Sequence, residues 1–250
     1  MFSIITCSIQ PEKFNAVGLM YQQVFAGTQW ELIGIHDAKS LAEGYNRGVD
    51  RARGDVLIFA HDDIEVLSPQ LPQRLMNHLE KFDLIGLAGT TRLIAPGWVF
   101  AGPPYIFGQV AHPAPDGPLI NVAIYGVPRR AIGGIQALDG LFMACRRSLL
   151  NRIKFDELTF DGFHHYDTDF SHNAFRNGLR VGVVCDINLF HQSGGNYDEK
   201  WHRSAEKFTQ KWLAHQYPLP ARKFVWAGIQ VATKAECLEI MNPTYWDEAR

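Results

Sequence analysis

Three adjacent polar side chains, His61, Asp62 and Asp63, directly follow the apolar run Val56–Ala60. Such a run predicts a buried strand, and in open α/β sheets ligands bind just outside the carboxyl ends of the strands. Carboxylates suit Mg²⁺ or Mn²⁺, and an imidazole favours Mn²⁺ or another transition metal. Residues 61 and 63 would point to the same side of an extended chain, so they are the candidate metal ligands. The alternative is a strand-end turn in which the carboxylates cap the next segment.

Two further acidic segments carry candidate chemistry. Asp167 and Asp169 stand at the start of a predicted helix, where either carboxylate would serve as an N-cap or as a general base. Asp139 and Gly140 form another acidic turn, whose glycine lets the backbone approach a ligand closely. His191 precedes a Ser-Gly-Gly loop, and it is interpreted as either a structural residue or a ligand.

The segment after residue 36 holds Asp37 and Ser40, which would either cap the next helix or lie beside a nucleotide base or ribose. The first strand is not followed by G-x-G-x-x-G, and G-x-x-x-x-G-K-[S/T] does not occur. The sequence therefore favours neither a dinucleotide-binding fingerprint nor a P-loop.

The elements that must position these residues alternate along the chain. Apolar runs and helical spacing predict strand, helix, strand, helix and strand over residues 2–60, which indicates a parallel sheet with right-handed crossovers. A helix over 69–81 and a strand over 84–89 follow. Pro and Gly make 96–119 an irregular excursion or hairpin. We expect the remaining elements at 121–127 (strand), 139–150 (strand-to-helix turn), 167–177 (helix), 180–185 (strand) and 199–215 (amphipathic helix).

Composition limits the class of protein. The chain has 250 residues, of which 46% are hydrophobic and 20% charged, as expected for a globular domain. A formal net charge of −2 does not suggest nucleic-acid binding. Four scattered cysteines predict free thiols and a reducing compartment. We see neither a signal peptide nor a membrane-spanning segment, so we expect a cytoplasmic protein, with a peripheral position at the inner face of the membrane as the alternative.

The ordered set of motifs over residues 2–195 resembles the GT-A glycosyltransferases, particularly the large inverting group that uses nucleotide-diphosphate sugars. The segments that carry the resemblance are Phe2–Ile9 (opening strand), Ser40–Gly48 with Ala52–Asp55 ("N-x-G…A-x-G-(D/E)"), Ile58–Asp63 ("DxD"), Asp139–Arg147 (acceptor-side turn), Phe160–Phe163 through Asp167–Phe170 with Arg176–Gly178 ("ED-x-D-(L/F)…R…G"), and Phe190 with His191 (late histidine).

The resemblance implies a single α/β domain over 1–250, with a Rossmann-like, mostly parallel central sheet flanked by helices. Residues 1–95 would form the nucleotide-sugar-binding half, 96–195 the acceptor and catalytic half, and 196–250 a C-terminal helical extension. A sugar would pass from a nucleotide diphosphate to a glycan, a lipid-linked acceptor or a protein, with inversion and with Mn²⁺ or Mg²⁺. The implied residues are Asp167 or Asp169 (base), His61, Asp63 and His191 (metal), Ser8, Asp37, Ser40, Asn46 and Asp62 (donor), and Asp139 and Gly140 (acceptor side).

Two positions depart from the family pattern. His61 replaces the first carboxylate of "DxD", and Tyr166 replaces the Glu of the Glu-Asp pair. We favour Asp167 over Asp169 as the base because it matches the Asp of that pair. A catalytically idle domain that binds a nucleotide sugar or a glycan, and a nucleotidyltransferase, are the alternatives.

The predicted helix over 199–215 carries apolar residues on one face and basic residues elsewhere. The apolar residues are Trp201, Ala205, Phe208 and Trp212, and the basic ones are Lys200, Arg203, Lys207 and Lys211. A helix that docks on the domain is the main interpretation, and contact with an anionic membrane surface is the alternative. A homodimer is a further expectation.

Overall fold

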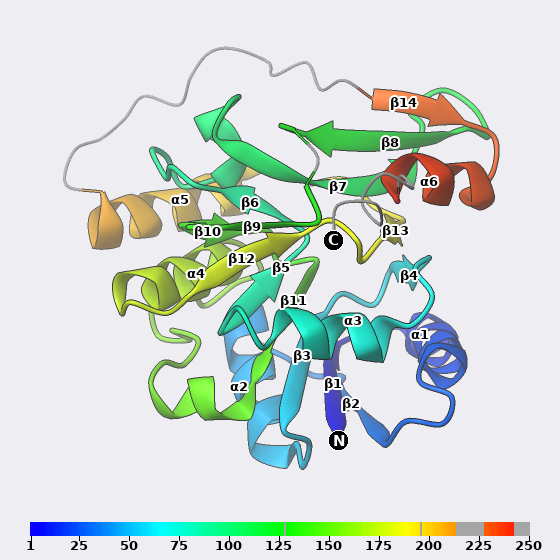
Figure 1. Cartoon of the computed structure of the whole chain (residues 1–250). Coiled ribbons are helices and arrows are strands. Elements are labelled where there is room, and N and C mark those ends of the chain that lie inside the picture. The colour runs from blue at the N-terminus through cyan, green and yellow to red at the C-terminus, as the bar shows by residue number, and fades with distance from the viewer. Residues whose placement is uncertain (128, 196, 214–227, 243–250) are drawn as a thin grey trace.

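The central layer is a seven-stranded mixed sheet (Figure 1). The computed structural model describes residues 1–127, 129–195, 197–213 and 228–242. The sheet contains, in spatial order, β2 (Trp30–Ile35), β1 (Phe2–Cys7), β3 (Val56–Ala60), β11 (Phe142–Arg146), β5 (Leu84–Gly86), β12 (Val181–Val184) and β9 (Ala131–Gly133). β1 is parallel to β2 and β3, and β5 to β12, but β11 is antiparallel to both β3 and β5. The α/β class holds, and the insertion of β11 makes the sheet mixed rather than mostly parallel.

Alternate side chains of the sheet pack into two different cores. Phe2 and Ile4 of β1 belong to one core, whereas Ile5 belongs to the other. The first core also contains residues of α1 (Pro11–Val24) and α3 (Leu71–His78), and the second contains residues of α2 (Leu41–Arg51) and α4 (Tyr166–Arg176). The period-two alternation of a strand buried on both faces therefore places helices on both sides of the sheet.

A second, mainly antiparallel sheet lies beyond the first, at the top of Figure 1. It contains, in spatial order, β10 (Ala137–Leu138), β6 (Ala88–Thr90), β7 (Ile106–Pro113), β13 (Leu189–His191) and β4 (Ile64–Val66), and β8 (Ile120–Tyr125) joins β7 to β14 (Gly228–Val231). Short 3₁₀ helices occur at Trp98–Ala101 and Arg147–Asn151.

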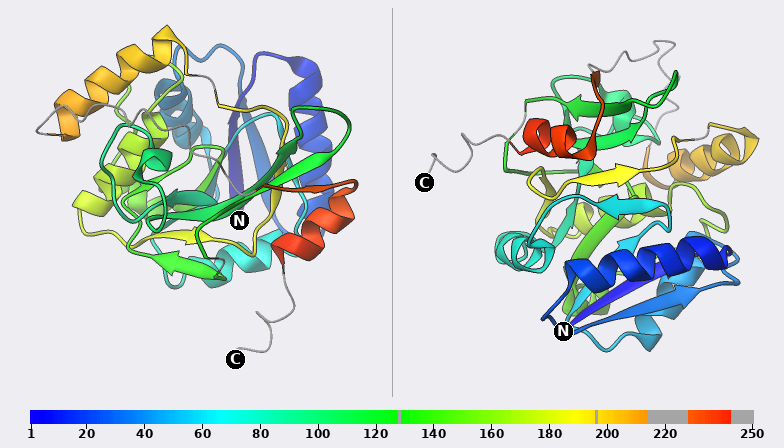
Figure 2. Two further views of the ribbon diagram at one scale, coloured as in Figure 1. Left: turned by 90° about the horizontal axis from the view of Figure 1, so that it is seen from above. Right: turned by 90° about the vertical axis from the view of Figure 1, so that its right-hand side faces the viewer.

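The sequence prediction missed two features of this sheet. The expected strand over 84–89 is divided between the two sheets, since β5 ends at Gly86 and β6 begins at Ala88. The region 96–119 contains the eight-residue strand β7, because Pro and Gly in the flanking turns hid its apolar pattern. Where the C-terminal part is described, it contributes β14 and α6 (Lys234–Met241) beside β8, so it is not purely helical (Figure 2).

Helix α5 (Glu199–Trp212) docks on α4 through the apolar face that its sequence predicts. The ring centroid of Trp201 lies 4.8 Å from that of His165, and Phe208 is fully buried. Lys207 and Lys211 form ion pairs with Asp161 and Asp156. These contacts support the docking interpretation of this helix; residues 214 and 215 of its predicted span lie outside the described residues.

Two expectations from composition can be compared directly with the structure. All four cysteines carry free thiols, and three of them are buried. Among the described residues, every helix is too short or too polar to cross a bilayer.

Helix α2 packs so closely on β1 that its glycines have no room for a side chain. A Cβ at Gly48 would lie 2.2 Å from Cγ2 of the buried Ile5. Gly18, inside α1, has only ordinary contacts, the nearest being Cδ2 of Leu32 at 3.5 Å. The two glycines are therefore a matched pair inside helices.

We predict opposite effects of alanine at these positions. Gly48→Ala overpacks the α2–β1 contact and lowers the free energy of unfolding by about 1–3 kcal/mol. Gly18→Ala raises it by up to about 1 kcal/mol, because alanine is the better helix former. Urea denaturation followed by circular dichroism measures both, and equal effects of the two substitutions would contradict the described packing.

Candidate active site

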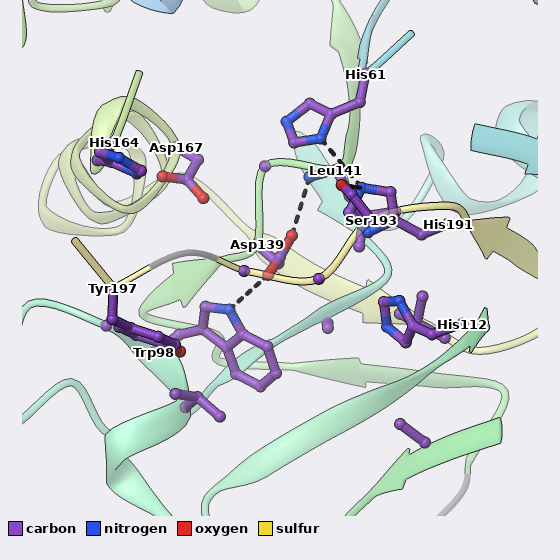
Figure 3. Close-up of a pocket in the computed structure, with 18 of the residues that line it drawn as sticks. His61, Trp98, His112, Asp139, Leu141, His164, Asp167, His191, Ser193 and Tyr197 are labelled. Atoms are coloured by element: carbon purple, nitrogen blue, oxygen red, sulfur yellow. Dashed lines mark hydrogen bonds between the residues drawn. The ribbon is translucent and has the colours of Figure 1, made fainter. Parts of the chain in front are cut away.

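A cavity of about 640 Å³ opens where the ends of β3, β7 and β13 meet the loop 139–141 and the start of α4. Figure 3 shows that its walls carry imidazoles, carboxylates and aromatic rings from segments far apart in the sequence. The polar groups on its walls that matter most below are His61, His112, Asp139, Tyr166, Asp167 and His191.

Strand pairing brings His61, Asp63 and His191 together. β4 begins one residue after Asp63 and runs antiparallel to β13, with Ile64 opposite His191. As a result, Nε2 of His191 lies 3.2 Å from Oδ1 of Asp63, and Nδ1 of His61 lies 4.0 Å from the same oxygen. The two imidazole nitrogens are 3.5 Å apart.

This cluster fits a divalent cation. One nitrogen or oxygen atom from each of the three residues lies within 4.8 Å of the others. Burial lowers the pKa of His61, which keeps a lone pair available on its ring. Burial opposes ionisation of Asp63, but hydrogen bonds from His191 and Ser193 outweigh it and hold its pKa below the ordinary value. Two imidazoles and a carboxylate suit Mn²⁺ or another first-row transition ion.

Asp167 faces the same cavity from the first turn of α4. Burial, together with the neighbouring carboxylate of Asp139, raises the pKa of Asp167 from 3.8 to about 7. A carboxylate with a pKa near neutrality can accept a proton during catalysis and release it afterwards. Both oxygens of Asp139 accept hydrogen bonds, one from Nε1 of Trp98 at 2.9 Å and one from the backbone N–H of Leu141 at 3.0 Å.

Gly140 permits the close approach of α4 to the loop 139–141. A Cβ at this position would lie 2.2 Å from the hydroxyl of Tyr166 and 2.7 Å from Cβ of Asp167. The same loop is fixed to β3, because the backbone N–H of His61 donates to the carbonyl of Leu141 at 3.1 Å. The loop therefore sets the spacing between Asp167 and the group formed by His61, Asp63 and His191, which we call the histidine cluster.

Three cavity residues escaped the sequence analysis as site residues. Nε2 of His61 lies 2.9 Å from the hydroxyl of Tyr166, a residue noted only as a departure from the family pattern. The ring centroid of His112 lies 5.4 Å from that of His191, and His112 comes from the strand hidden in region 96–119. Trp98, also in that region, holds Asp139. Only Tyr166, adjacent to Asp167, had a usable signal in the sequence.

The expected donor residues Ser8 and Asp62 meet at the ends of β1 and β3. Oγ of Ser8 donates to Oδ2 of Asp62 at 2.7 Å, and Nδ1 of His36 lies 2.7 Å from the carbonyl of Ser8. Asp62 and Asp63 lie in the turn between β3 and β4 rather than on an extended chain, and within this turn Asp62 binds Ser8 while Asp63 contacts His191. Ser8, His36 and Asp62 thus lie at the carboxyl ends of the strands, where a nucleotide is expected to bind.

Four other predicted site residues have structural partners and do not line the cavity. Ser40 is the N-cap of α2 and accepts from the N–H of Glu43 at 3.1 Å. Asn46 donates to the carbonyl of Phe155 and to Glu157. Asp37 is exposed and forms an ion pair with Arg47. The fourth, Asp169, is fully buried, where it accepts from Nε1 of Trp212 at 2.6 Å and pairs with Lys211 at 2.7 Å.

A family profile and a solved structure agree with this architecture. A profile described as "Glycosyltransferase like family" matches residues 3–241. No curated protein sequence matches the chain. GalNAc-T7, solved with UDP, GalNAc and Mn²⁺, is 11% identical with a TM-score of 0.52, and the match covers 85% of this chain and 48% of that one. S. aureus TarS 1–349 with UDP-GlcNAc is 12% identical with a TM-score of 0.45, over 78% of this chain and 59% of that one.

The two solved structures are longer, and this chain spans about half of GalNAc-T7 and three-fifths of the TarS fragment. At such low identity, the likeness to GalNAc-T7 bears on the fold alone, and that fold is GT-A. The profile match, in contrast, extends over nearly the whole chain. The chain therefore has a GT-A fold and belongs to the glycosyltransferase-like family, in the group related to family 2.

Proposed function

We propose that this glycosyltransferase moves a hexosyl group from a nucleotide-diphosphate sugar to an acceptor hydroxyl with inversion, with Asp167 as the general base and a divalent cation at His61, Asp63 and His191. The observation that carries the proposal is the position of Asp167. Its carboxylate has a pKa of about 7 and faces the cavity whose wall also holds His61 and His191.

The charges around the cavity support a cation-assisted reaction. Among the described residues, neither lysine nor arginine lines the cavity. A bound diphosphate would therefore need positive charge from another source. A divalent cation held by His61, Asp63 and His191 would supply that charge. When bound, Mn²⁺ or Mg²⁺ would neutralise charge that develops on the diphosphate leaving group.

The carboxylates support a single displacement. Asp167 would take the proton of the acceptor hydroxyl while the acceptor oxygen forms a bond to the anomeric carbon and the bond from that carbon to the phosphate oxygen breaks. The nucleoside diphosphate would leave on the opposite face, which inverts the centre. Asp139 has a supporting place in this step: hydrogen bonds from Trp98 and Leu141 fix its carboxylate near Asp167, where its charge helps to raise the pKa of the base.

The donor and the acceptor would occupy different sides of this centre. Ser8 and Asp62 at the strand ends suit the nucleoside part of the donor. On the acceptor side, Trp98, Tyr125 and Tyr197 line the cavity around Asp139. Aromatic faces with one polar anchor suit an acceptor that has both apolar faces and hydroxyl groups.

We predict that conservative changes at Asp167 and Asp169 separate chemistry from stability. Asp167→Asn keeps the shape of the side chain but removes the base, so turnover falls about 10²- to 10⁴-fold while donor binding is retained. Asp169→Asn weakens the contacts with Lys211 and Trp212, and lowers the free energy of unfolding by about 1–3 kcal/mol. Release of nucleoside diphosphate measures the first effect, and urea denaturation the second.

Asp161→Asn serves as the matched control, because Asp161 is an exposed carboxylate close to the same helix and pairs only with Lys207 among the described contacts. We expect it to change neither turnover nor stability appreciably. Near-normal turnover of Asp167→Asn would show that another group is the base.

We predict that turnover rises with pH through an apparent pKa near 7, because Asp167 must be ionised to accept a proton. The same group links stability to pH. Its pKa in the folded state exceeds the ordinary value of 3.8, so its contribution to stability is complete below pH about 4 and is lost as the pH rises to about 7.

Initial rates and melting temperatures between pH 4.5 and 8.5 test both effects, and Asp167→Asn should lack this component of the stability change. A wild-type rate that is independent of pH between about 6 and 8 would contradict the assignment of the base.

A further inference from the structure

The hydroxyl of Tyr166 lies between the loop 139–141 and the histidine cluster. Tyr166 is only 4% exposed, and its ring packs against Tyr45 and Phe155. Its hydroxyl lies 2.9 Å from Nε2 of His61 and donates to the carbonyl of Gly140 at 3.3 Å. The aromatic neighbours fix the ring, so the hydroxyl has a defined place beside His61.

The hydrogen bonds around Tyr166 favour one tautomer of His61. The Tyr166 hydroxyl donates its single proton to the carbonyl of Gly140, which can only accept. With the phenol proton on that carbonyl, the Tyr166 oxygen can accept from Nε2–H of His61 at 2.9 Å, and this geometry favours the tautomer whose lone pair is on Nδ1. Nδ1 is the nitrogen that lies 3.5 Å from Nε2 of His191 and 4.0 Å from Oδ1 of Asp63.

The two departures from the family pattern therefore contact each other. His61 stands where a carboxylate is usual, and Tyr166 stands where the Glu of the Glu-Asp pair is usual. A carboxylate at position 166 would offer no proton to the carbonyl of Gly140, whereas the phenol satisfies both neighbours. Gly140 completes the arrangement, because a Cβ there would lie 2.2 Å from the hydroxyl.

We propose that Tyr166 is a positioning residue for the metal site: it holds His61 with Nδ1 free to bind, so that two imidazoles and one carboxylate select a first-row transition ion over Mg²⁺. The proposal rests on the cation site of the proposed function. Outer-shell hydrogen bonds of this kind fix the tautomer and the ring orientation of ligating histidines. Magnesium prefers an all-oxygen shell and would gain little from the orientation of an imidazole.

Removing one hydroxyl tests this role. Tyr166→Phe keeps the packed ring and removes the acceptor for Nε2–H. Tyr21→Phe is the matched control, since the hydroxyl of Tyr21 is also buried, has no hydrogen-bond partner among the described residues and belongs to the other core. Isothermal titration with CoCl₂, MnCl₂ and MgCl₂ measures affinity, and the visible absorption of bound Co²⁺ reports its ligands. Circular dichroism checks that each variant is folded.

We predict that wild type and Tyr21→Phe bind Co²⁺ and Mn²⁺ more tightly than Mg²⁺. In Tyr166→Phe, affinity for Co²⁺ and Mn²⁺ falls about 10- to 100-fold with a smaller change for Mg²⁺, and the Co²⁺ spectrum changes. A second variant, His61→Asp, shifts the preference towards Mg²⁺ without altering Tyr166, and keeps the test open if Tyr166→Phe does not fold.

The outcomes separate the two proposals. If His61→Ala and Asp63→Ala abolish binding but Tyr166→Phe binds Co²⁺ with wild-type affinity and spectrum, the positioning role is wrong and the cation site stands. If His61→Asp keeps the wild-type preference for Co²⁺ over Mg²⁺, the proposed basis of selectivity is wrong. If the wild-type protein binds none of the three ions, the cation site of the proposed function fails, and the role of Tyr166 fails with it.

Discussion

The insertion of β11 between β3 and β5 is the constraint on which the site depends. β11 runs antiparallel to β3 with Phe142 opposite Ala60, so the loop before β11 lies beside the carboxyl end of β3. The N–H of His61 and the carbonyl of Leu141 fix that contact. Because Gly140 leaves room for α4, Tyr166 and Asp167 then reach the same place. The antiparallel strand within this sheet is therefore what brings the polar groups of the cavity together.

The pKa values of two carboxylates at this site are shifted in opposite directions. Near the histidines, hydrogen bonds from His191 and Ser193 outweigh burial and hold the pKa of Asp63 below its ordinary value, so this carboxylate stays ionised beside His61, whose own pKa is lowered by burial. In contrast, burial and Asp139 raise the pKa of Asp167 to about 7. Asp63 and Asp167 thus differ in proton affinity because of their surroundings, as their proposed roles of cation ligand and general base require.

Much of this arrangement follows from local sequence. The apolar run Val56–Ala60 predicts β3 and places His61, Asp62 and Asp63 at its end, and helical spacing predicts the existence and order of α1, α2 and α5. Pairing between strands that lie far apart in the chain could not be predicted from local sequence. The antiparallel direction of β11 and the division of residues 84–89 between two sheets depend on partners far away in the chain. Asp169 is buried against α5 for the same reason, since its partners lie more than forty residues later.

The most direct test of the account is a thermal-shift screen of UDP, GDP, dTDP, CDP and ADP, each with and without Mn²⁺, on the wild-type protein and on Asp63→Ala. A ligand that binds only the folded state raises the melting temperature. The account predicts that one nucleotide raises it in a manner that requires both Mn²⁺ and Asp63. Stabilisation that is independent of Mn²⁺ and unchanged in Asp63→Ala, or the absence of a shift with every nucleotide, would contradict it.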